Sequence, residues 1–538
     1  MTSSTGSAWL IALVLLPLLG GAAVAGIRTE RTAKLTALVV SLAQVVLAAG
    51  AWLSYDPHGT RLQLVSSTDW IPSFGVHISF GVDGIALVMI AITSVLMPIV
   101  IGGSWSERLP EGRTASGFFS LLLILQALVT GVFAATDVFL FYVFFEVMLV
   151  PMYFLIGRFG GPRRQYAAVK FFLYSLLGGL IMLGSVIGVY VVSGERLAAG
   201  TFDWATLTRV VSNAPTSTQI WLFLGFFIAF AIKAPLVPLH TWLPDATAEA
   251  PIAVGVILVG VLDKVGVYGF LRYNIPLFPA ASRELSTLLL VLAVVGVLYG
   301  ALLAAGQSDM KRFIAYVSIA HFGFIALGVF AFNQQAGVGA VAYMVNHSIS
   351  TGMLLIAIGM VIARGRSRIA EDYGGMARVT PLLGGIMLIA GLTALSLPGT
   401  NSFVSEFLVL IGSLQTEPVY AILATVGMVL AAVYVLWLYQ RVMHGPVRGA
   451  ALTGLAGAPG AAPRPESSAS KAISDLSIRE RIVIAPLLVL VLFLGFYPKP
   501  LLEVIGPSVS ATLQSVGVSD SGPVGTGGAA ATGQQEGK

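Results

Sequence analysis

Long runs of apolar residues recur from one end of the chain to the other, and short segments between them carry most of the charge. With a window of roughly 19 apolar residues as the criterion for a membrane span, we expect about fourteen spanning helices. Their expected ranges are 7–27, 35–54, 82–103, 115–135, 138–157, 166–192, 218–239, 248–272, 285–305, 312–332, 336–363, 382–414, 418–443 and 480–497. The pattern therefore predicts an all-α polytopic membrane protein.

Two of these spans, the seventh and the twelfth, are interrupted by helix-breaking residues. The seventh is broken at "KAPLVP", directly after Lys233, and the twelfth at "LPGTN", shortly before Glu406. Because the two lie five spans apart, and five is an odd number, the second unit would be inverted relative to the first. Interrupted helices at matching positions of two halves indicate an inverted repeat with an ion site near the bilayer midplane.

Several ionisable residues lie well inside predicted spans, where a charge costs roughly 2.5 to 3.5 kcal/mol. They are Glu146, Lys233, Asp263, Lys264 and Glu406. Structural alternatives exist: the lysines can snorkel to an interface, and Glu146 can be a static hydrogen-bonded anchor. Asp263 and Lys264 are neighbours that point about 100° apart on a helix, so they need not pair. We favour proton transfer, because a buried lysine holds or releases its proton as a carboxylate such as Glu146 moves toward it or away.

The histidines divide by position. His240 follows the first break, and His321 and His347 lie in the tenth and eleventh spans. Imidazole titrates near physiological pH, which favours a proton relay for these three. The alternatives are satisfied packing residues or, for two separated histidines, haem ligands. His58 and His77 fall in a predicted surface loop.

Composition narrows the function classes. The chain has 538 residues, is 57% hydrophobic and 10% charged, and has a net charge of +5 and no cysteine. Its positive residues, among them Arg163, Arg164 and Lys170, lie in short segments between helices, where they act as topology signals. This placement argues against binding of nucleic acid. It also predicts that both termini lie outside the cell. Arg272 and Arg283 are exceptions on the positive-poor side. The absence of cysteine excludes disulfides and cysteine-ligated iron–sulfur clusters.

Five motifs together resemble a known family. They are "FYVFFEVMLVPMYFLIG", "KAPLVPLHTWLPDATAEAP", "GVLDKVGVYGFLRY", "DMKRFIAYVSIAHFGF" and "LPGTNSFVSEFLVL". In this order and spacing the chain resembles the antiporter-like membrane subunits of respiratory complex I (NADH:quinone oxidoreductase), and chain M best. The family usually has histidine where Thr247 stands and an apolar residue where Asp263 stands.

The resemblance implies fourteen helices with spans 4–8 and 9–13 as the inverted repeat. The expected units are N-terminal helices at 1–111, a first repeat at 112–275, a second at 276–446, a Pro/Ala/Ser-rich cytoplasmic linker at 447–477, a last span at 478–500 and a low-complexity tail at 501–538. It also implies that Glu146 and Lys233 form a controlling ion pair, that Lys264 links two half-channels, that His321 and His347 belong to the central axis, and that Glu406 lies on the exit side.

The leading hypothesis is a proton-translocating subunit of complex I in a bacterial cell membrane, coupled by ion-pair-controlled pKa switching of buried lysines to quinone reduction in partner subunits. We expect no cofactor on this chain; FMN, iron–sulfur clusters and quinone would belong to partner subunits, and the expected neighbours are the other membrane-arm subunits, especially two sister antiporter-like chains, and lipid. A subunit of a multisubunit cation/proton antiporter is the alternative. A monomeric solute carrier and a purely structural scaffold are further possibilities.

Overall fold

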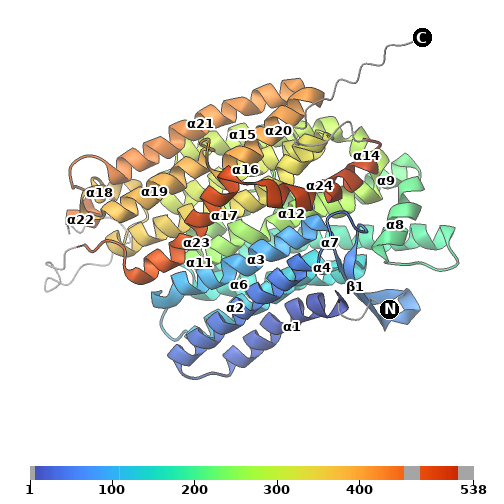
Figure 1. Ribbon diagram of the computed structural model, residues 1–538, viewed down its shortest axis with the longest axis horizontal. Helices are drawn as coiled ribbons and strands as arrows, with labels where there is room; N and C mark the ends of the chain where they lie inside the picture. Colours follow the sequence, from blue (N-terminus) through green and yellow to red (C-terminus); the bar gives the residue numbers. More distant parts are fainter. Residues whose placement is uncertain (1–5, 108, 454–472, 519–538) are drawn as a thin grey trace, which may run out of the picture.

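Residues 6–107, 109–453 and 473–518 are described by a computed structural model, in which long helices run side by side along the longest axis (Figure 1). Within these residues, twelve helices are long and apolar enough to cross a membrane, and a bent pair near the C-terminus raises the number to 13. Each of the predicted span ranges overlaps a helix of the structure. The prediction of an all-α polytopic membrane protein is thus confirmed.

The N-terminal part contains four spanning helices and a small sheet. Its elements are α1 (Gly6–Ala25), α2 (Glu30–Leu53), β1 (Gln63–Ile71), η1 (Pro72–Phe74), β2 (Val76–Val82), α3 (Gly84–Gly103), η2 (Ser104–Ser106) and α4 (Ala115–Ala134). We expected a surface loop before α3, and within it β1 and β2 pair as an antiparallel hairpin. Together with α8 and α14 this hairpin lies at one end of the bundle, which we call the hairpin end; α18 and α22 lie at the opposite end (Figure 1).

The next helices contain the first interrupted span. They are α5 (Val138–Val147), α6 (Leu149–Phe159), α7 (Arg164–Arg196), α8 (Trp204–Val210), η3 (Val211–Asn213), α9 (Thr216–Lys233), α10 (Trp242–Glu249), α11 (Ile252–Ile257), η4 (Leu258–Leu262), α12 (Lys264–Gly269), η5 (Phe270–Asn274), α13 (Ile275–Leu277) and α14 (Pro279–Glu284). The helix ends at Lys233 because the following prolines cannot continue it. The eighth span is a continuous run from α11 to α13 that contains two π-helical turns, η4 and η5.

The remaining helices contain the second interruption. They are α15 (Ser286–Ala305), α16 (Met310–Phe330), α17 (Gln334–Gly365), η6 (Ala370–Asp372), α18 (Met376–Val379), α19 (Pro381–Ala394), α20 (Asn401–Thr416), α21 (Pro418–Met443), α22 (Ala450–Thr453), α23 (Ile478–Phe496) and α24 (Lys499–Gln514). In the break between α19 and α20, Ser396 and Gly399 take positive φ values of 59° and 93°.

The C-terminal part differs from the prediction in one respect. Residues 501–514, which we expected in the tail, form most of α24, an amphipathic helix bent by 70° from α23. An apolar row including Leu501, Val504 and Ile505 is buried, so this segment packs as a helix. The predicted linker 447–477 and the predicted tail both lie largely outside the described residues, at 454–472 and 519–538.

The centre of the bundle is formed by the helices that contain the candidate site. The apolar windows of Ile252–Leu277, Met310–Phe330 and Gln334–Gly365 are 100%, 94% and 89% buried, against 28% for Glu30–Leu53 and 33% for Pro418–Met443. Lys264, His321 and His347 therefore lie on the most deeply buried helices of the bundle.

Candidate functional site

Lys233 ends the first half of the interrupted seventh span. Its side chain is fully buried, and its Nζ donates a hydrogen bond to Ser175 Oγ on α7 at 3.0 Å. The ammonium also lies over the rings of Phe145 and Phe171, at 5.5 and 5.0 Å from their centroids. A cation held by one hydroxyl and two aromatic faces keeps much less stabilisation than it has in water. Lys233 is therefore positioned where its charge depends strongly on nearby groups.

Glu146 lies at the end of α5 and points toward α7. A Cβ on Gly179 would come within 1.6 Å of Glu146 Oε1, so the glycine makes room for the carboxylate. Within the described residues Glu146 Oε1 has no hydrogen-bond partner, and Glu146 forms no ion pair with Lys233. The expected direct ion pair is thus not formed in this structure, although the two charges act on each other through space.

Lys264, at the centre of the eighth span, has the most polar contacts of the buried lysines. Its Nζ lies 2.6 Å from His347 Nδ1 and 3.2 Å from Asp263 Oδ1, and it also donates to the Val259 carbonyl. The π-helical turn makes that last contact possible, because the Asp263 amide bonds Leu258, five residues back, instead of Val259. Asp263 and Lys264 do pair, since the lysine side chain turns back along the helix.

The two central histidines continue this contact into the second half of the chain. The His347 ring stands at 90° to the His321 ring, with 5.2 Å between centroids. His321 Nε2 lies 3.1 Å from the Ala394 carbonyl, at the point where α19 breaks. His321 Nδ1 and His347 Nε2 have no hydrogen-bond partner among the described residues. Both imidazoles therefore keep a ring nitrogen free for a proton.

Glu406 is held beyond the second break by two hydroxyl groups. Tyr343 on α17 donates to Glu406 Oε2 at 2.9 Å, and Ser396 in the break donates to the same oxygen. The Tyr343 ring also lies 5.6 Å from the His321 ring. The helix break is thus what brings Ser396 to Glu406. Tyr343 was missed by sequence reasoning, because one tyrosine in an apolar helix gives no signal of a partner 63 residues away.

Together these contacts form a buried row of ionisable side chains, which we call the central row. Its members, in spatial order, are Lys264, His347, His321, Tyr343 and Glu406, and each is at most 3% exposed. It begins in the eighth span and ends in the twelfth. Lys233 and Glu146 lie outside this row.

His240 is placed apart from the central row. It lies in the first break, is 4% exposed, and its ring packs edge-on against Tyr299 with 5.1 Å between centroids. Its Nδ1 has no hydrogen-bond partner in the described part of the chain. Thr247, where the family usually has histidine, is fully buried and its hydroxyl is likewise unpartnered there.

Ion pairs at the end opposite the hairpin were not expected from the sequence. Asp245 on α10 accepts from Lys170 at 2.7 Å and from Arg312, and Glu249 pairs with Arg368 at 3.2 Å. The carboxylates of α10 thereby connect helices of both halves. Topology signals can be recognised in a sequence, but their partners lie 67 to 119 residues away.

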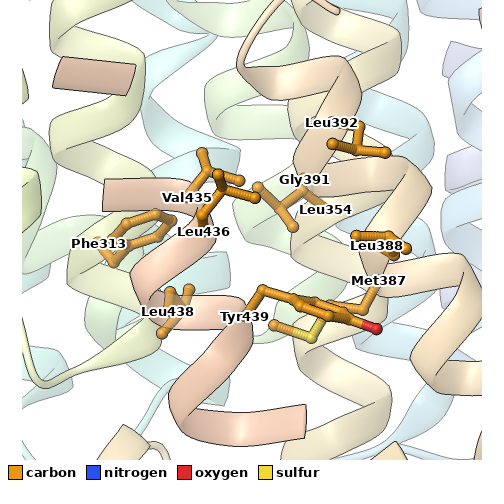
Figure 2. A pocket seen from close by; sticks show the side chains of 10 residues that line it. All are labelled: Phe313, Leu354, Met387, Leu388, Gly391, Leu392, Val435, Leu436, Leu438 and Tyr439. Carbon is orange, nitrogen blue, oxygen red and sulfur yellow. The ribbon is translucent and has the colours of Figure 1, made fainter. Parts of the chain in front are cut away.

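The pocket drawn in Figure 2 does not belong to the central row. Figure 2 shows that its lining comes from α16, α17, α19 and α21 and is almost wholly aliphatic, with Tyr439 contributing the only oxygen-bearing side chain among the labelled residues. It offers neither charge nor a set of donors for a ligand. The described residues contain no group of three or more His, Cys, Asp or Glu side chains able to hold a metal ion.

A bundle of apolar helices with a row of ionisable groups through its buried centre is a polytopic membrane protein with an intramembrane polar axis. Two helices broken beside that axis are typical of ion-translocating folds. The chain belongs to the family described as NADH:quinone oxidoreductase/Mrp antiporter, TM, which matches residues 135–431.

Curated relatives agree with this assignment. The chain is 41% identical over 548 residues to NADH-quinone oxidoreductase subunit M of Mycobacterium tuberculosis (strain ATCC 25618 / H37Rv), covering 96% of both chains. It is 37% identical over 507 residues to the subunit of the same name from Escherichia coli (strain K12), covering 91% of this chain and 95% of the relative. The expected resemblance to antiporter-like complex I subunits of chain M type is confirmed.

Solved structures show the same fold. A chain of respiratory complex I from Thermus thermophilus with bound NADH superposes with a TM-score of 0.83 at 29% identity, covering 95% of this chain and 100% of that one. A chain of the Mrp complex from Dietzia sp. DQ12-45-1b gives a TM-score of 0.82 at 24% identity, covering 96% and 100%, and shows likeness of fold alone.

Proposed function

We propose that this chain is a proton-translocating membrane subunit of a bacterial NADH:quinone oxidoreductase. The single observation that carries the proposal is the central row, in which a buried lysine, two histidines, a tyrosine and a glutamate follow one another through contacts. The names of the relatives at 41% and 37% identity support the assembly. The chain lies in the cell membrane with both termini outside, and the redox centres lie on partner subunits, among them two sister antiporter-like chains.

In this proposal protons pass along the central row and the first repeat loads it. Lys264 Nζ and His347 Nδ1 are within direct hydrogen-bond distance, so a proton can pass between them without an intervening water. The histidines can receive it on one ring nitrogen and pass it on from the other, since each ring keeps one nitrogen without a hydrogen-bond partner among the described residues. Glu406, with two hydroxyl donors, is the acceptor at the other end of the row.

Glu146 controls the loading step by its distance from Lys233. When the two are apart, as in this structure, Ser175 is the one hydrogen-bond acceptor of the ammonium within the described residues. When the carboxylate approaches, the protonated lysine is stabilised. Quinone reduction in partner subunits would drive this approach and separation. The inverted five-helix repeats, with breaks after Lys233 and before Glu406, supply the two half-channels.

The test compares Glu406→Gln with Glu503→Gln in membranes that contain the assembled complex. Glu503 on α24 is a matched control, because it is 60% exposed and its one ion-pair partner in the described part of the chain is Lys499 at the surface. NADH-driven quinone reduction and acidification of inverted vesicles are recorded together, after assembly has been checked on native gels. Loss of acidification in Glu406→Gln, with Glu503→Gln unchanged, supports the proposal; wild-type acidification in both variants contradicts it.

A subunit of a multisubunit cation/proton antiporter is the second candidate, favoured by the family description and by the likeness to the Dietzia Mrp fold. It predicts sodium–proton exchange that does not depend on NADH. Purification separates the two: a complex I subunit should copurify with flavin and NADH-oxidising activity, and an antiporter subunit should copurify with neither.

A further inference from the structure

An aromatic layer fills the part of the first repeat between the buried lysines and the hairpin end. In α5 and α9, aromatic side chains lie between the charged residue and the helix end nearer the hairpin, and in the eighth span they follow Lys264 toward that end. The layer consists of Phe141, Phe145, Phe223, Phe226, Phe230, Phe270, Tyr273 and Phe278, all fully buried. Ring centroids are 4.2 Å apart for Phe141–Tyr273 and 5.7 Å for Phe226–Phe278.

Two arginines lie at the hairpin-end side of this layer. Arg272 is 2% exposed, its Nη1 donates to Asp83 Oδ2 at 2.6 Å, and its guanidinium lies 4.2 Å from the centroid of the Trp204 ring. Arg61 lies 4.9 Å from the centroid of the same ring and donates to Thr512 Oγ1 of α24 at 3.1 Å. Among the described residues this arginine pair has two guanidinium groups and one paired carboxylate, so the Arg61 charge has no ion-pair partner there.

Nitrogen atoms of the pair also lack partners. Arg272 Nε and Nη2 and Arg61 Nε form no hydrogen bond within the described residues. A guanidinium in this position cannot give up its proton, since arginine stays protonated in proteins. It is thus a fixed positive charge, unlike the lysines deeper in the repeat.

The second repeat is built differently at the same end. Beyond Glu406, α20 carries Ser413 on the same face, seven residues on, and Gln415 near its end. Gln415 is exposed and accepts from the half-buried Asn333 at 3.1 Å. Two polar side chains, Ser413 and Gln415, thus lie on α20 between Glu406 and the surface, whereas aromatic rings and an arginine pair follow Lys233 and Lys264.

We propose that the aromatic layer and the Arg61–Arg272 pair form a proton barrier, which closes the hairpin-end half of the first repeat. An apolar constriction excludes water, and a fixed positive charge beside it repels hydronium and other cations. A proton on Lys233 or Lys264 is thereby prevented from leaking out of the first repeat and is directed into the central row. This inference rests on the proposed proton translocation.

The test measures passive proton uptake by proteoliposomes containing the purified whole complex, with an imposed potassium diffusion potential and no NADH. Arg272→Gln should raise passive uptake on the order of tenfold, because a unit charge at close range in an effective dielectric of about 20 changes an ion's energy by enough for that factor. NADH oxidation should continue while net acidification falls. Arg61→Gln is the second variant, since Arg61 is less buried and its removal is better tolerated.

Two control variants keep both positive charges of the barrier. Arg283→Gln removes an arginine at the same end, which donates to the Val516 carbonyl and, among the described residues, makes no cation–π contact with the aromatic layer. Asp83→Asn keeps Arg272 and can still cap α3, because asparagine is a good N-cap residue. Neither variant should raise passive proton uptake above the wild-type level.

The outcomes separate the barrier from the proposed function. Increased passive proton uptake in Arg272→Gln or Arg61→Gln, with wild-type uptake in Arg283→Gln and Asp83→Asn, supports the barrier. This conclusion does not depend on the acidification measured for Glu406→Gln. Wild-type passive uptake in assembled Arg272→Gln and Arg61→Gln overturns it. Equal leak in Asp83→Asn overturns it too, because general loosening of this end would then be the cause. Loss of acidification without leak in Arg272→Gln also overturns it, since the arginine would then belong to a conducting path.

Discussion

The Asp263–Lys264 pair gives a prediction that can be worked through as a double-mutant cycle. Both side chains are fully buried and their charged atoms are 3.2 Å apart. At that separation, and with an effective dielectric of about 20, Coulomb attraction is worth about 5 kcal/mol. This agrees with the roughly 3 to 5 kcal/mol that removal of one partner of a buried pair usually costs. Lys264→Met should therefore destabilise the chain by about that amount.

The double variant Asp263→Asn/Lys264→Met should recover most of this loss. It leaves no buried charge at the site, and replacing both partners of a buried pair is often close to neutral. Asp263→Asn alone should be milder than Lys264→Met, because the lysine keeps its contacts with His347 and the Val259 carbonyl. NADH-driven acidification should be absent in both variants that lack the lysine.

Stability is best followed by the amount of chain retained in the complex on native gels after heating, since activity is lost with Lys264 in any case. The predicted order of retention is wild type, then Asp263→Asn and the double variant, then Lys264→Met. If the double variant is retained no better than Lys264→Met, the pair is not energetically coupled, and the interpretation of Asp263 as the counter-charge of Lys264 is refuted.

Three further variants test other parts of the structure. Tyr343→Phe removes a hydrogen bond to the Glu406 carboxylate, which is worth about 1.5 to 3 kcal/mol. Acidification of inverted vesicles should therefore fall roughly tenfold or more, while assembly on native gels is kept. Unchanged acidification would show that Tyr343 does not belong to the central row. Burial raises the pKa of Glu107, in the loop after η2, to about 7, so the folded chain binds the carboxyl proton more tightly than the unfolded chain. The heat stability of the protein should therefore fall as pH rises from about 4.5 to about 7. Glu107→Gln should remove this pH dependence, and an equal pH dependence in the variant and the wild type would contradict the prediction. Arg364 forms two hydrogen bonds to Glu480, at 3.0 and 2.9 Å, which connect α17 to α23. Arg364→Lys cannot keep both, and should lower heat stability by about 1 kcal/mol or more in the native-gel assay. Retention equal to that of the wild type would show that the contact is dispensable.

Much of the fold followed from hydropathy and proline. The ranges of the spans depend on local composition alone, and so do the breaks after Lys233 and before Glu406, since proline and glycine act on the backbone where they stand. The helix α24 was missed because its apolar residues are spaced for a surface helix and form no continuous run. The β1–β2 hairpin was missed because β1 is mostly polar and exposed, although its partner β2 is largely buried.

The candidate residues could be found in the sequence, but their contacts could not. A charge inside an apolar span is visible at once, whereas its partner is set by how helices pack: Lys264 meets His347 across 83 residues of chain. The π-helical turn that opens the Val259 carbonyl has no sequence signature in a run of valine, leucine and glycine. The separation of Glu146 from Lys233 is a matter of ångströms and belongs to the tertiary structure alone.

The most direct test of proton transfer in this chain is a comparison of Lys233→Ala with wild type in inverted membrane vesicles, with Lys499→Ala as control. Lys499 is 61% exposed on α24, so its loss should leave the complex unaffected. NADH-driven quinone reduction and vesicle acidification are measured together, once native gels show equal assembly. We predict that both activities fall in Lys233→Ala and are unchanged in Lys499→Ala. Wild-type rates of both activities in an assembled Lys233→Ala complex would contradict it.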